Sequence, residues 1–293
     1  MTIASHVWPG YELMFLARGE GWLPEGAIRL LETTSATRSM LALREGRAHG
    51  AALTLDEVML MRAEGIPLTV VLVFDISAGA DVVLSRPPIR ELRDLRGKRI
   101  AAETTALGAV MLTRLLDKAG LQRSDVNIVS IASDEHLQAW RSGKLDALIT
   151  YEPTASRLLN EGAHRLLDSR HFPESIFDVL AVRPDVAQRQ SAALRSLIAG
   201  HFKGIRQLRQ NPQDTAYRLA GRLNLAGDQA LQAFRGLHLP GLPQNRALLA
   251  ANGRLYQIGA ELSGIMHGNA QLKRPDTLDG LISDHYLPEN ESA

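Results

Sequence analysis

Hydroxyl and carboxyl side chains follow several predicted strands, at the points where a strand gives way to a helix. Thr33-Thr34-Ser35 follows the second predicted strand, and Glu103-Thr104-Thr105 follows a strand in the second part of the chain. In parallel α/β sheets, ligands bind beyond the carboxyl ends of the strands, where helix N-termini present free N–H groups. Each run holds more polar groups than one helix cap needs. The two runs could therefore clamp a polar or anionic group from both sides.

Helix capping is the alternative explanation for each of these hydroxyl groups. Serine and threonine are ordinary N-caps, and one such cap stabilises a helix by about 1 kcal/mol. At any single position, capping is favoured over ligand contact. Ser133, which is followed by Asp134 and Glu135, is typical of capping alone.

Aromatic and acidic residues stand at other strand ends. Trp8 and Tyr11 flank Pro9-Gly10 directly after the first predicted strand, where they could form the apolar wall of a binding site. Packing of one of them into the core is an equal alternative. Asp75 and Asp178 follow or enter apolar runs, and could meet a ligand ammonium group or a partner arginine. A solvated loop carboxylate is the other interpretation of each.

No arrangement of residues is typical of catalysis. The nine histidines are scattered, and His6 is the only one near the predicted cleft. A lone histidine is more often a structural hydrogen-bonding group than a catalyst. The chain has no cysteine, which excludes disulfides, thiolate metal sites and a cysteine nucleophile. We find neither a nucleophile-elbow motif nor a metal-spaced histidine pair, and we expect no catalytic residue, no metal site and no cofactor.

The elements that must position these residues are those of an α/β fold. Short strands alternate with amphipathic helices over the first two-thirds of the chain, a pattern that predicts mostly parallel sheets. The apolar run Leu68 to Phe74 predicts a strand covered on both faces. Further strands are predicted over 3–7, 100–102, 126–131 and 145–149. After about Pro184 the pattern is helical, with helices expected over 192–209, 214–223, 228–237 and 245–265.

One internal similarity indicates how the fold is organised. Ala42 to Ala51 parallels Ala139 to Leu148, and both segments contain a helix, an Arg-x-Gly-basic turn and a buried strand. Coincidence is the alternative, because helix–glycine–strand units are common in α/β chains. The two segments occupy equivalent places, which suggests two lobes built on one plan.

Composition narrows the class of protein. The chain has 293 residues, of which 45% are hydrophobic, enough for two lobes of ordinary domain size. Its 33 basic and 32 acidic residues give a net charge of +1, which offers no global field for nucleic acid or an anionic membrane. The longest apolar run, Leu68 to Phe74, is too short to cross a bilayer.

Several phrases, by their order and spacing, resemble the periplasmic solute-binding proteins of ABC importers. The closest group is the nitrate/sulfonate/taurine-binding and thiamin-precursor-binding (NMT1/THI5-like) proteins. The phrases that carry the resemblance are Leu13 to Leu31, Ser39 to Gly50, Glu64 to Pro67, Asp75 to Ala101, Ser142 to Ala147 and Tyr151-Glu152-Pro153.

The resemblance implies a type II periplasmic-binding fold, in which two lobes are joined by a two-crossing hinge. Lobe I would comprise residues 1–80 and a helical segment, 182–293, and lobe II residues 81–181. Ligand binding would close the lobes by a hinge motion. We expect a monomer whose partners are a small-molecule ligand and an ABC permease in the inner membrane. We also expect a periplasmic location, with a signal sequence, absent from this chain, removed.

The resemblance also implies which residues contact the ligand. The positions that correspond to family contacts are Trp8, Tyr11, Thr34, Ser35, Thr54, Ser77, Thr104, Thr105, Tyr151 and Glu152. Glu103-Thr104-Thr105 lacks the glycine-serine often found there in the family, a departure that speaks against a bound sulfonate or nitrate. The acidic set Asp75, Glu152 and Asp178 instead indicates a ligand with an amino or ring N–H group.

The sequence thus predicts a solute-binding protein for a small polar organic molecule of sulfonate, amino or pyrimidine type. Two alternatives remain open. One is an enzyme on the same fold, as in menaquinone-pathway enzymes and the pyrimidine synthases of the THI5 group, although the latter carry a cysteine-rich signature that this chain lacks. The other is a ligand-sensing domain for a signalling partner.

Overall fold

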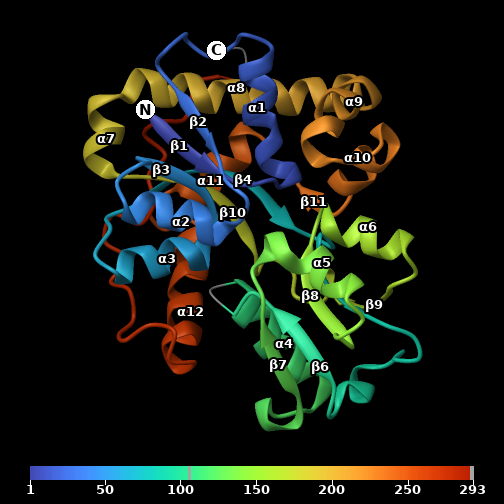
Figure 1. Ribbon diagram of the computed structural model, residues 1–293. Coiled ribbons are helices and arrows are strands. Elements are labelled where there is room, and N and C mark those ends of the chain that lie inside the picture. The colour runs from blue at the N-terminus through green and yellow to red at the C-terminus, as the bar shows by residue number, and fades with distance from the viewer. Residues whose placement is uncertain (105–106, 291–293) are drawn as a thin grey trace.

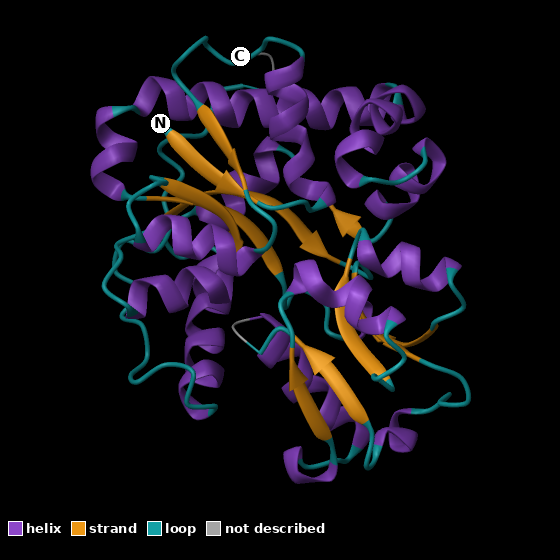
Figure 2. Ribbon diagram, in the orientation of Figure 1, coloured by secondary structure: helices purple, strands orange, loops and turns teal. Residues whose placement is uncertain are grey.

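Two β-sheets organise the chain, and helices cover both of them (Figures 1 and 2). The computed structural model describes residues 1–104 and 107–290. The first sheet contains β1 (Thr2–Ser5), β2 (Arg29–Glu32), β3 (Gly50–Thr54), β4 (Thr69–Ser77), β10 (Phe177–Val182) and β11 (Leu237–His238), in the order β11-β4-β10-β3-β1-β2. The second contains β5 (Asp81–Ser85), β6 (Arg99–Ala102), β7 (Asn127–Ser130), β8 (Ala147–Tyr151) and β9 (His164–Asp168), in the order β7-β6-β8-β5-β9.

Helices connect the strands and then dominate the C-terminal part. Those that follow strands of the first sheet are α1 (Glu12–Gly19), α2 (Ala36–Arg44) and α3 (Leu55–Ala63). The second sheet carries α4 (Leu107–Ala119), α5 (His136–Arg141) and α6 (Thr154–Asn160). The C-terminal helices are α7 (Pro184–Arg189), α8 (Ser191–Gln210), α9 (Pro212–Leu223), α10 (Gly227–Phe234), α11 (Leu242–Leu249) and α12 (Arg254–Gly268). Short 3-10 helices are η1 (Pro9–Tyr11), η2 (Leu92–Leu95), η3 (Arg123–Asp125), η4 (Ser133–Glu135) and η5 (Ser169–His171).

The chain passes between the sheets twice. It leaves the first sheet after β4, builds the whole second sheet from β5 to β9, and returns at β10. The return therefore precedes Phe177, and the boundary expected at 181 is wrong because it falls inside β10, which pairs with both β3 and β4. The C-terminal helices then pack back on the first half of the chain, α8 against α1 and α12 against α3. With the boundary moved, the division into two lobes remains our proposal.

Both sheets are mixed, which corrects the expectation of mostly parallel sheets. β10 runs antiparallel to β3 and β4, and β5 runs antiparallel to β8 and β9. The reason is the crossing itself. A strand that enters directly from the other sheet begins at the edge facing that sheet, where β3 and β8 end. In the registers, Asp178 of β10 lies opposite Thr54, and Asp81 of β5 lies opposite Tyr151.

The two sheets share one plan, as the internal similarity predicts. The order β2-β1-β3-β10-β4 in the first sheet matches β7-β6-β8-β5-β9 in the second, with parallel and antiparallel neighbours at the same places. The similar segments are α2 to β3 and α5 to β8. Their turns hold Gly46 and Gly143 at φ of +69° and +75°, a left-handed conformation that favours glycine.

The C-terminal prediction needs two corrections. The helix expected over 245–265 is interrupted between α11 and α12, where a Cβ on Gly253 would lie 2.5 Å from the carbonyl oxygen of Ala247. The helix expected to reach 237 ends at Phe234, and Leu237 and His238 pair with β4 instead. Among the described residues, we find no helix with the length and apolar character needed to span a membrane.

Candidate functional site

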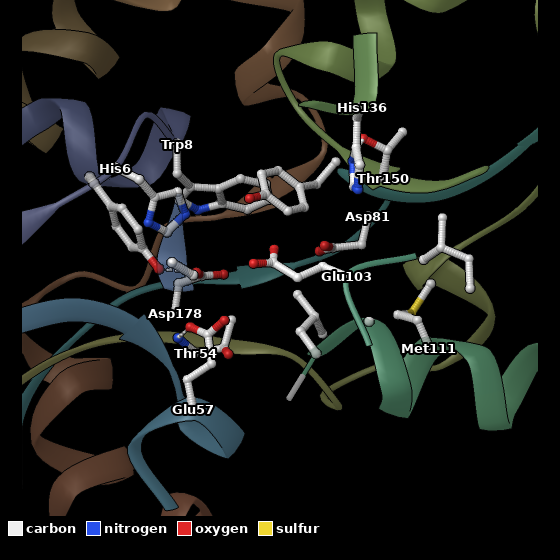
Figure 3. Close-up of a pocket in the computed structure, with 16 residues that line it drawn as sticks. His6, Trp8, Thr54, Glu57, Asp81, Glu103, Met111, His136, Thr150 and Asp178 are labelled. Atoms are coloured by element: carbon white, nitrogen blue, oxygen red, sulfur yellow. Dashed lines mark hydrogen bonds between the residues drawn. The ribbon is translucent and has the colours of Figure 1, made fainter. Parts of the chain in front are cut away.

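A cavity lies where the strand ends of the two sheets face each other (Figure 3). It is lined by His6, Trp8, Tyr11, Ala36, Thr54, Glu57, Asp81, Glu103, Leu107, Gly108, Met111, His136, Ile149, Thr150, Tyr151 and Asp178. The centre of a water molecule can occupy about 30 Å³ of it. That is room for about two water molecules. The space left between the facing strand ends is therefore small in this structure.

Three neighbouring strands of the first sheet bring polar side chains together on one wall. Asp178 of β10 lies opposite Thr54 of β3 on one side and Asp75 of β4 on the other. The Tyr11 hydroxyl donates to Asp178 Oδ1 at 2.5 Å, and Trp8 Nε1 donates to Asp75 Oδ2 at 3.0 Å. The turn from β1 into α1 thereby holds both carboxyl groups.

Gly10 lets this turn approach the sheet. A Cβ at this position would lie 1.8 Å from Asp75 Oδ2. Any residue with a Cβ at position 10 would therefore push the Asp75 carboxyl group out of its place. The segment Trp8-Pro9-Gly10-Tyr11 can therefore lie against Asp75 because position 10 is glycine.

The second sheet supplies the opposite wall. Asp81 begins β5, and Glu103 follows β6. The Thr37 hydroxyl, in the first turn of α2, donates to the Glu103 carboxylate across the gap between the sheets. His136 Nδ1 lies 3.0 Å from Thr150 Oγ1, so this histidine is fixed against β8.

Aromatic rings close the cavity from both sides. Tyr151 at the end of β8 packs edge-on against Trp8, with 5.8 Å between ring centroids and planes at 80°. His6 packs edge-on against Tyr11 at 5.3 Å. The first sheet thus provides one ring of the Trp8–Tyr151 contact and the second sheet the other.

Several buried polar atoms around the cavity have no hydrogen-bond partner within the described parts of the chain. On cavity-lining residues these atoms are His6 Nδ1, Thr54 Oγ1, Asp81 Oδ2 and Asp178 Oδ2. Oδ1 of Asp75, directly behind the wall, is also without a partner. Buried polar groups are usually hydrogen-bonded, so unpartnered ones gathered at one place are free for a ligand.

Burial dominates the electrostatics of the carboxyl groups. It raises the pKa of Asp81 to about 7 and the pKa of Glu57 well above its usual range. The pKa of Asp178 is also raised well above its usual range, by burial and by the facing Asp75. Burial raises the pKa of Glu103 as well. Among the described lining residues there is no lysine or arginine to compensate these acids.

Burial has the opposite effect on the two histidines of the cavity. It lowers the pKa of His6 and that of His136 to about 4, so both are neutral at pH 7. The expectation that His6 is the only histidine near the cleft is wrong, since His136 also lines the cavity. His6 does not act as a hydrogen-bonding group through Nδ1, which has no partner.

The predicted ligand-binding residues fall into distinct groups. Those that line the cavity are Trp8, Tyr11, Thr54, Tyr151 and Asp178. Asp75 lies directly behind Trp8. Thr105 lies outside the described residues.

The remaining predicted residues contact protein groups and are not among the cavity-lining residues. Ser35 caps α2 by accepting from the Arg38 N–H at 3.3 Å, and Glu152 accepts from the Ser156 N–H at 3.1 Å. Ser77 bonds to Ser169 Oγ at 2.8 Å beside the crossing segments, and Thr104 bonds to Ser130 Oγ at 2.6 Å.

Thr34 joins the two halves of the chain. Its hydroxyl donates to Asp134 Oδ2 at 2.6 Å. Capping alone does not describe the Ser133-Asp134-Glu135 segment, because η4 begins at Ser133 without a side-chain cap while Asp134 bonds to Thr34.

Sequence reasoning did not select several residues that line the cavity. These are His6, Ala36, Glu57, Asp81, Glu103, Leu107, Gly108, Met111, His136, Ile149 and Thr150. Glu103 belongs to the run Glu103-Thr104-Thr105, which the sequence predicts to be one side of a clamp, but it is not among the individual residues predicted to bind the ligand. Glu57 accepts from the Thr54 N–H at 2.9 Å, which in sequence is indistinguishable from an ordinary helix-capping acid.

Comparison with known proteins decides the family. Residues 9–215 match the model of the NMT1/THI5-like family. The chain belongs to this family. A protein of Escherichia coli (strain K12), whose name proposes that it binds aliphatic sulfonates, is 26% identical to this NMT1/THI5-like chain over 179 residues. The alignment covers 60% of the chain but only 56% of that relative's length.

Solved structures show the same fold. The periplasmic aliphatic sulphonate binding protein SsuA from Escherichia coli aligns with a TM-score of 0.80 and 19% identity, over 99% of this chain and 94% of that one. SsuA from Xanthomonas axonopodis pv. citri, bound to MOPS, aligns with a TM-score of 0.77 and 15% identity, over 98% and 97%. The desulfurization enzyme DSZB aligns with a TM-score of 0.70 and 16% identity, over 97% of both chains. The predicted α/β periplasmic-binding fold is confirmed.

Proposed function

We propose that this NMT1/THI5-like chain is the solute-binding component of an ABC importer and works in the periplasm. It captures a small polar organic molecule between its sheets and presents the closed form to a membrane permease. The observation that carries the proposal is the cavity itself. It is built from strand ends of both sheets and lined by buried polar atoms without partners in the described chain, such as Asp81 Oδ2 and Asp178 Oδ2.

Hinge opening supplies the route to the cavity. Space for about two water molecules cannot admit an organic solute, so the halves must part before it enters. The crossing segments, 78–80 and 169–176, are the connections between strands of the two sheets. Closure around the solute excludes water and strengthens the hydrogen bonds made to it.

An enzyme is the second candidate, favoured by the structural similarity to DSZB and by a histidine beside carboxyl groups in the cavity. His6 is neutral at pH 7, and its unpartnered Nδ1 could transfer a proton. A cysteine nucleophile is excluded, because the chain has no cysteine.

The test begins with the protein as purified from its host. The protein is unfolded in denaturant, the released compounds are identified by mass spectrometry, and the stripped chain is refolded. We expect small-angle X-ray scattering to give a larger radius of gyration for the stripped chain. Adding back the released compound should restore the smaller value and leave the compound chemically unchanged.

The variant Tyr151→Ala should weaken rebinding of the released compound, because it removes one ring of the aromatic contact between the halves. The matched control is Tyr256→Ala on α12, which is not among the lining residues. An unchanged radius of gyration with no released compound would refute the solute-binding proposal. Chemical conversion of the compound by the chain would instead support the enzyme as the function.

A further inference from the structure

The cavity is acidic on every side. Glu57 comes from α3, Asp81 from β5, Glu103 from the segment after β6, and Asp178 from β10. In Figure 3 the carboxyl groups of Asp178, Glu103 and Asp81 lie in a row across the cavity, with Glu57 below them. No lysine or arginine is found among the lining residues that the structure describes. A free anion entering here would meet carboxyl groups from both sheets.

Two of these carboxyl groups keep an acceptor atom free. Asp81 and Asp178 are 2% and 3% exposed, and Oδ2 of each has no hydrogen-bond partner in the described chain. Leaving a buried acceptor unsatisfied is costly, so each atom is a strong site for an N–H donor brought by a ligand. For Asp81 Oδ2, no described protein group supplies a donor, whereas the Asp178 carboxyl group faces that of Asp75 and hydrogen-bonds to it when protonated.

Carboxyl groups of the protein lie at two of the helix N-termini near the cavity. Such termini attract anions, but the protein's own carboxylates already occupy two of them. Glu103 accepts from Thr37 in the first turn of α2, and Glu57 accepts from the Thr54 N–H at the start of α3. A ligand anion would meet these carboxyl groups at the starts of α2 and α3.

The walls beside the acids are aromatic. Trp8 and Tyr151 line the cavity from opposite sheets, and Tyr11 lies beside Trp8 at 6.4 Å between ring centroids. Aromatic faces attract cations as well as apolar rings. The combination of free acceptors and aromatic walls fits a ligand with a cationic head and an aromatic body.

We propose that the cavity takes a small organic cation with N–H donors, of ammonium or amidinium type, and rejects free sulfonates. Asp81 and Asp178 accept the N–H groups of the head, and Trp8 and Tyr151 enclose its body. This inference rests on the proposed solute-binding function and adds the ligand class to it.

The test uses matched probes on the stripped full-length chain. Benzylamine and benzamidine carry the cationic head, benzyl alcohol is a neutral analogue, and benzenesulfonate is the anionic one. Titration calorimetry at pH 8 should show benzylamine or benzamidine binding at least tenfold more tightly than benzyl alcohol. Benzenesulfonate should give no measurable binding.

Variants assign the acceptors. Asp81→Asn and Asp178→Asn should each weaken binding of the cationic probe at least tenfold, because an amide cannot form the charge-assisted hydrogen bond that the carboxylate forms with a bound cation. Asp284→Asn, at an exposed position away from the cavity, is the matched control and should leave the affinity unchanged. Two independent acid variants keep the test valid if one of them folds poorly.

Three results would overturn the inference. They are tighter binding of benzenesulfonate than of benzylamine, equal binding of benzyl alcohol, and absence of binding by both cations. None of these touches the solute-binding proposal, which is decided by the released compound and the change in radius of gyration. A released compound without nitrogen that still restores the closed form would refute the ligand class alone.

Discussion

Asp81 and Asp75 are buried carboxyl groups whose ionised forms the fold disfavours. Burial raises the pKa of Asp81 to about 7, whereas an unfolded aspartate titrates near about 3.9. Asp56 and Glu152, which act on Asp81, raise its pKa further, and burial also raises the pKa of Asp75, to about 8. Protonation therefore favours the folded state, and this stabilisation is lost as pH rises through these pKa values.

The resulting prediction concerns stability between pH 6.5 and pH 8. The unfolding free energy of the ligand-free chain should fall across this range, by up to about 1.4 kcal/mol per pH unit for each group still protonated. His6 and His136 make the unfolding free energy rise with pH, but only below about pH 6.5, because their lowered pKa values disfavour the charged form in the folded state. Urea unfolding at three pH values measures the slope.

Asp81→Asn should reduce this slope, and Asp284→Asn should not. Stability that rises with pH over the range, or equal slopes for the two variants, would mean that the buried acids do not carry the effect.

At the residue scale, residue type and position along the chain predicted some of the side chains that line the cavity. For Trp8 and Tyr11 the sequence leaves core packing and ligand contact as equal alternatives; both side chains are buried and both line the cavity, and ligand contact stays a prediction. Glu57 was not selected because its bond to a backbone N–H makes it look like a cap. Only the folded structure shows that the same residue also lines the cavity.

At the level of elements, the residues at the start of α2 have two different roles, helix capping and contact with the other half of the chain, which the sequence alone does not assign. Ser35 caps the helix through the Arg38 N–H, whereas the Thr34 hydroxyl reaches Asp134 in the other half of the chain. Ser35→Ala should lower the unfolding free energy by about 1 kcal/mol and leave the affinity for the cationic probe unchanged. Thr34→Val should weaken the affinity and cost little stability, because it removes a contact between the halves that the proposed hinge opening would break. Calorimetric titration together with urea unfolding checks both, and similar effects of the two substitutions would contradict the division of roles.

Strand direction was beyond prediction for a physical reason. The predicted strands over 100–102 and 145–149 correspond closely to β6 and β8. β5 and β9 have five residues each, no fewer than β6 and β8, yet they were not predicted. Their antiparallel direction follows from the crossing between sheets, which depends on where distant segments pair.

For the whole molecule, order along the chain was more informative than any single motif. The sequence of phrases from Leu13 to Pro153 resembled the NMT1/THI5-like family, and the family model matches residues 9–215. The repeated helix–turn–strand segment correctly indicated that both sheets follow one plan. The cavity could not be predicted in the same way, because its acids come from segments that are far apart in the sequence and belong to both sheets.

Closure itself can be measured directly, because the chain has no cysteine to interfere with labelling. Arg38 in α2 and Glu135 in η4 are exposed and lie next to the Thr34–Asp134 contact between the halves. Spin labels on Arg38→Cys and Glu135→Cys should move apart when ligand is removed and approach again when it is restored. The pair Arg29→Cys and Arg38→Cys, both in the half built on the first sheet, should keep its distance in both states. If the first pair also kept its distance, the proposed hinge opening would be refuted.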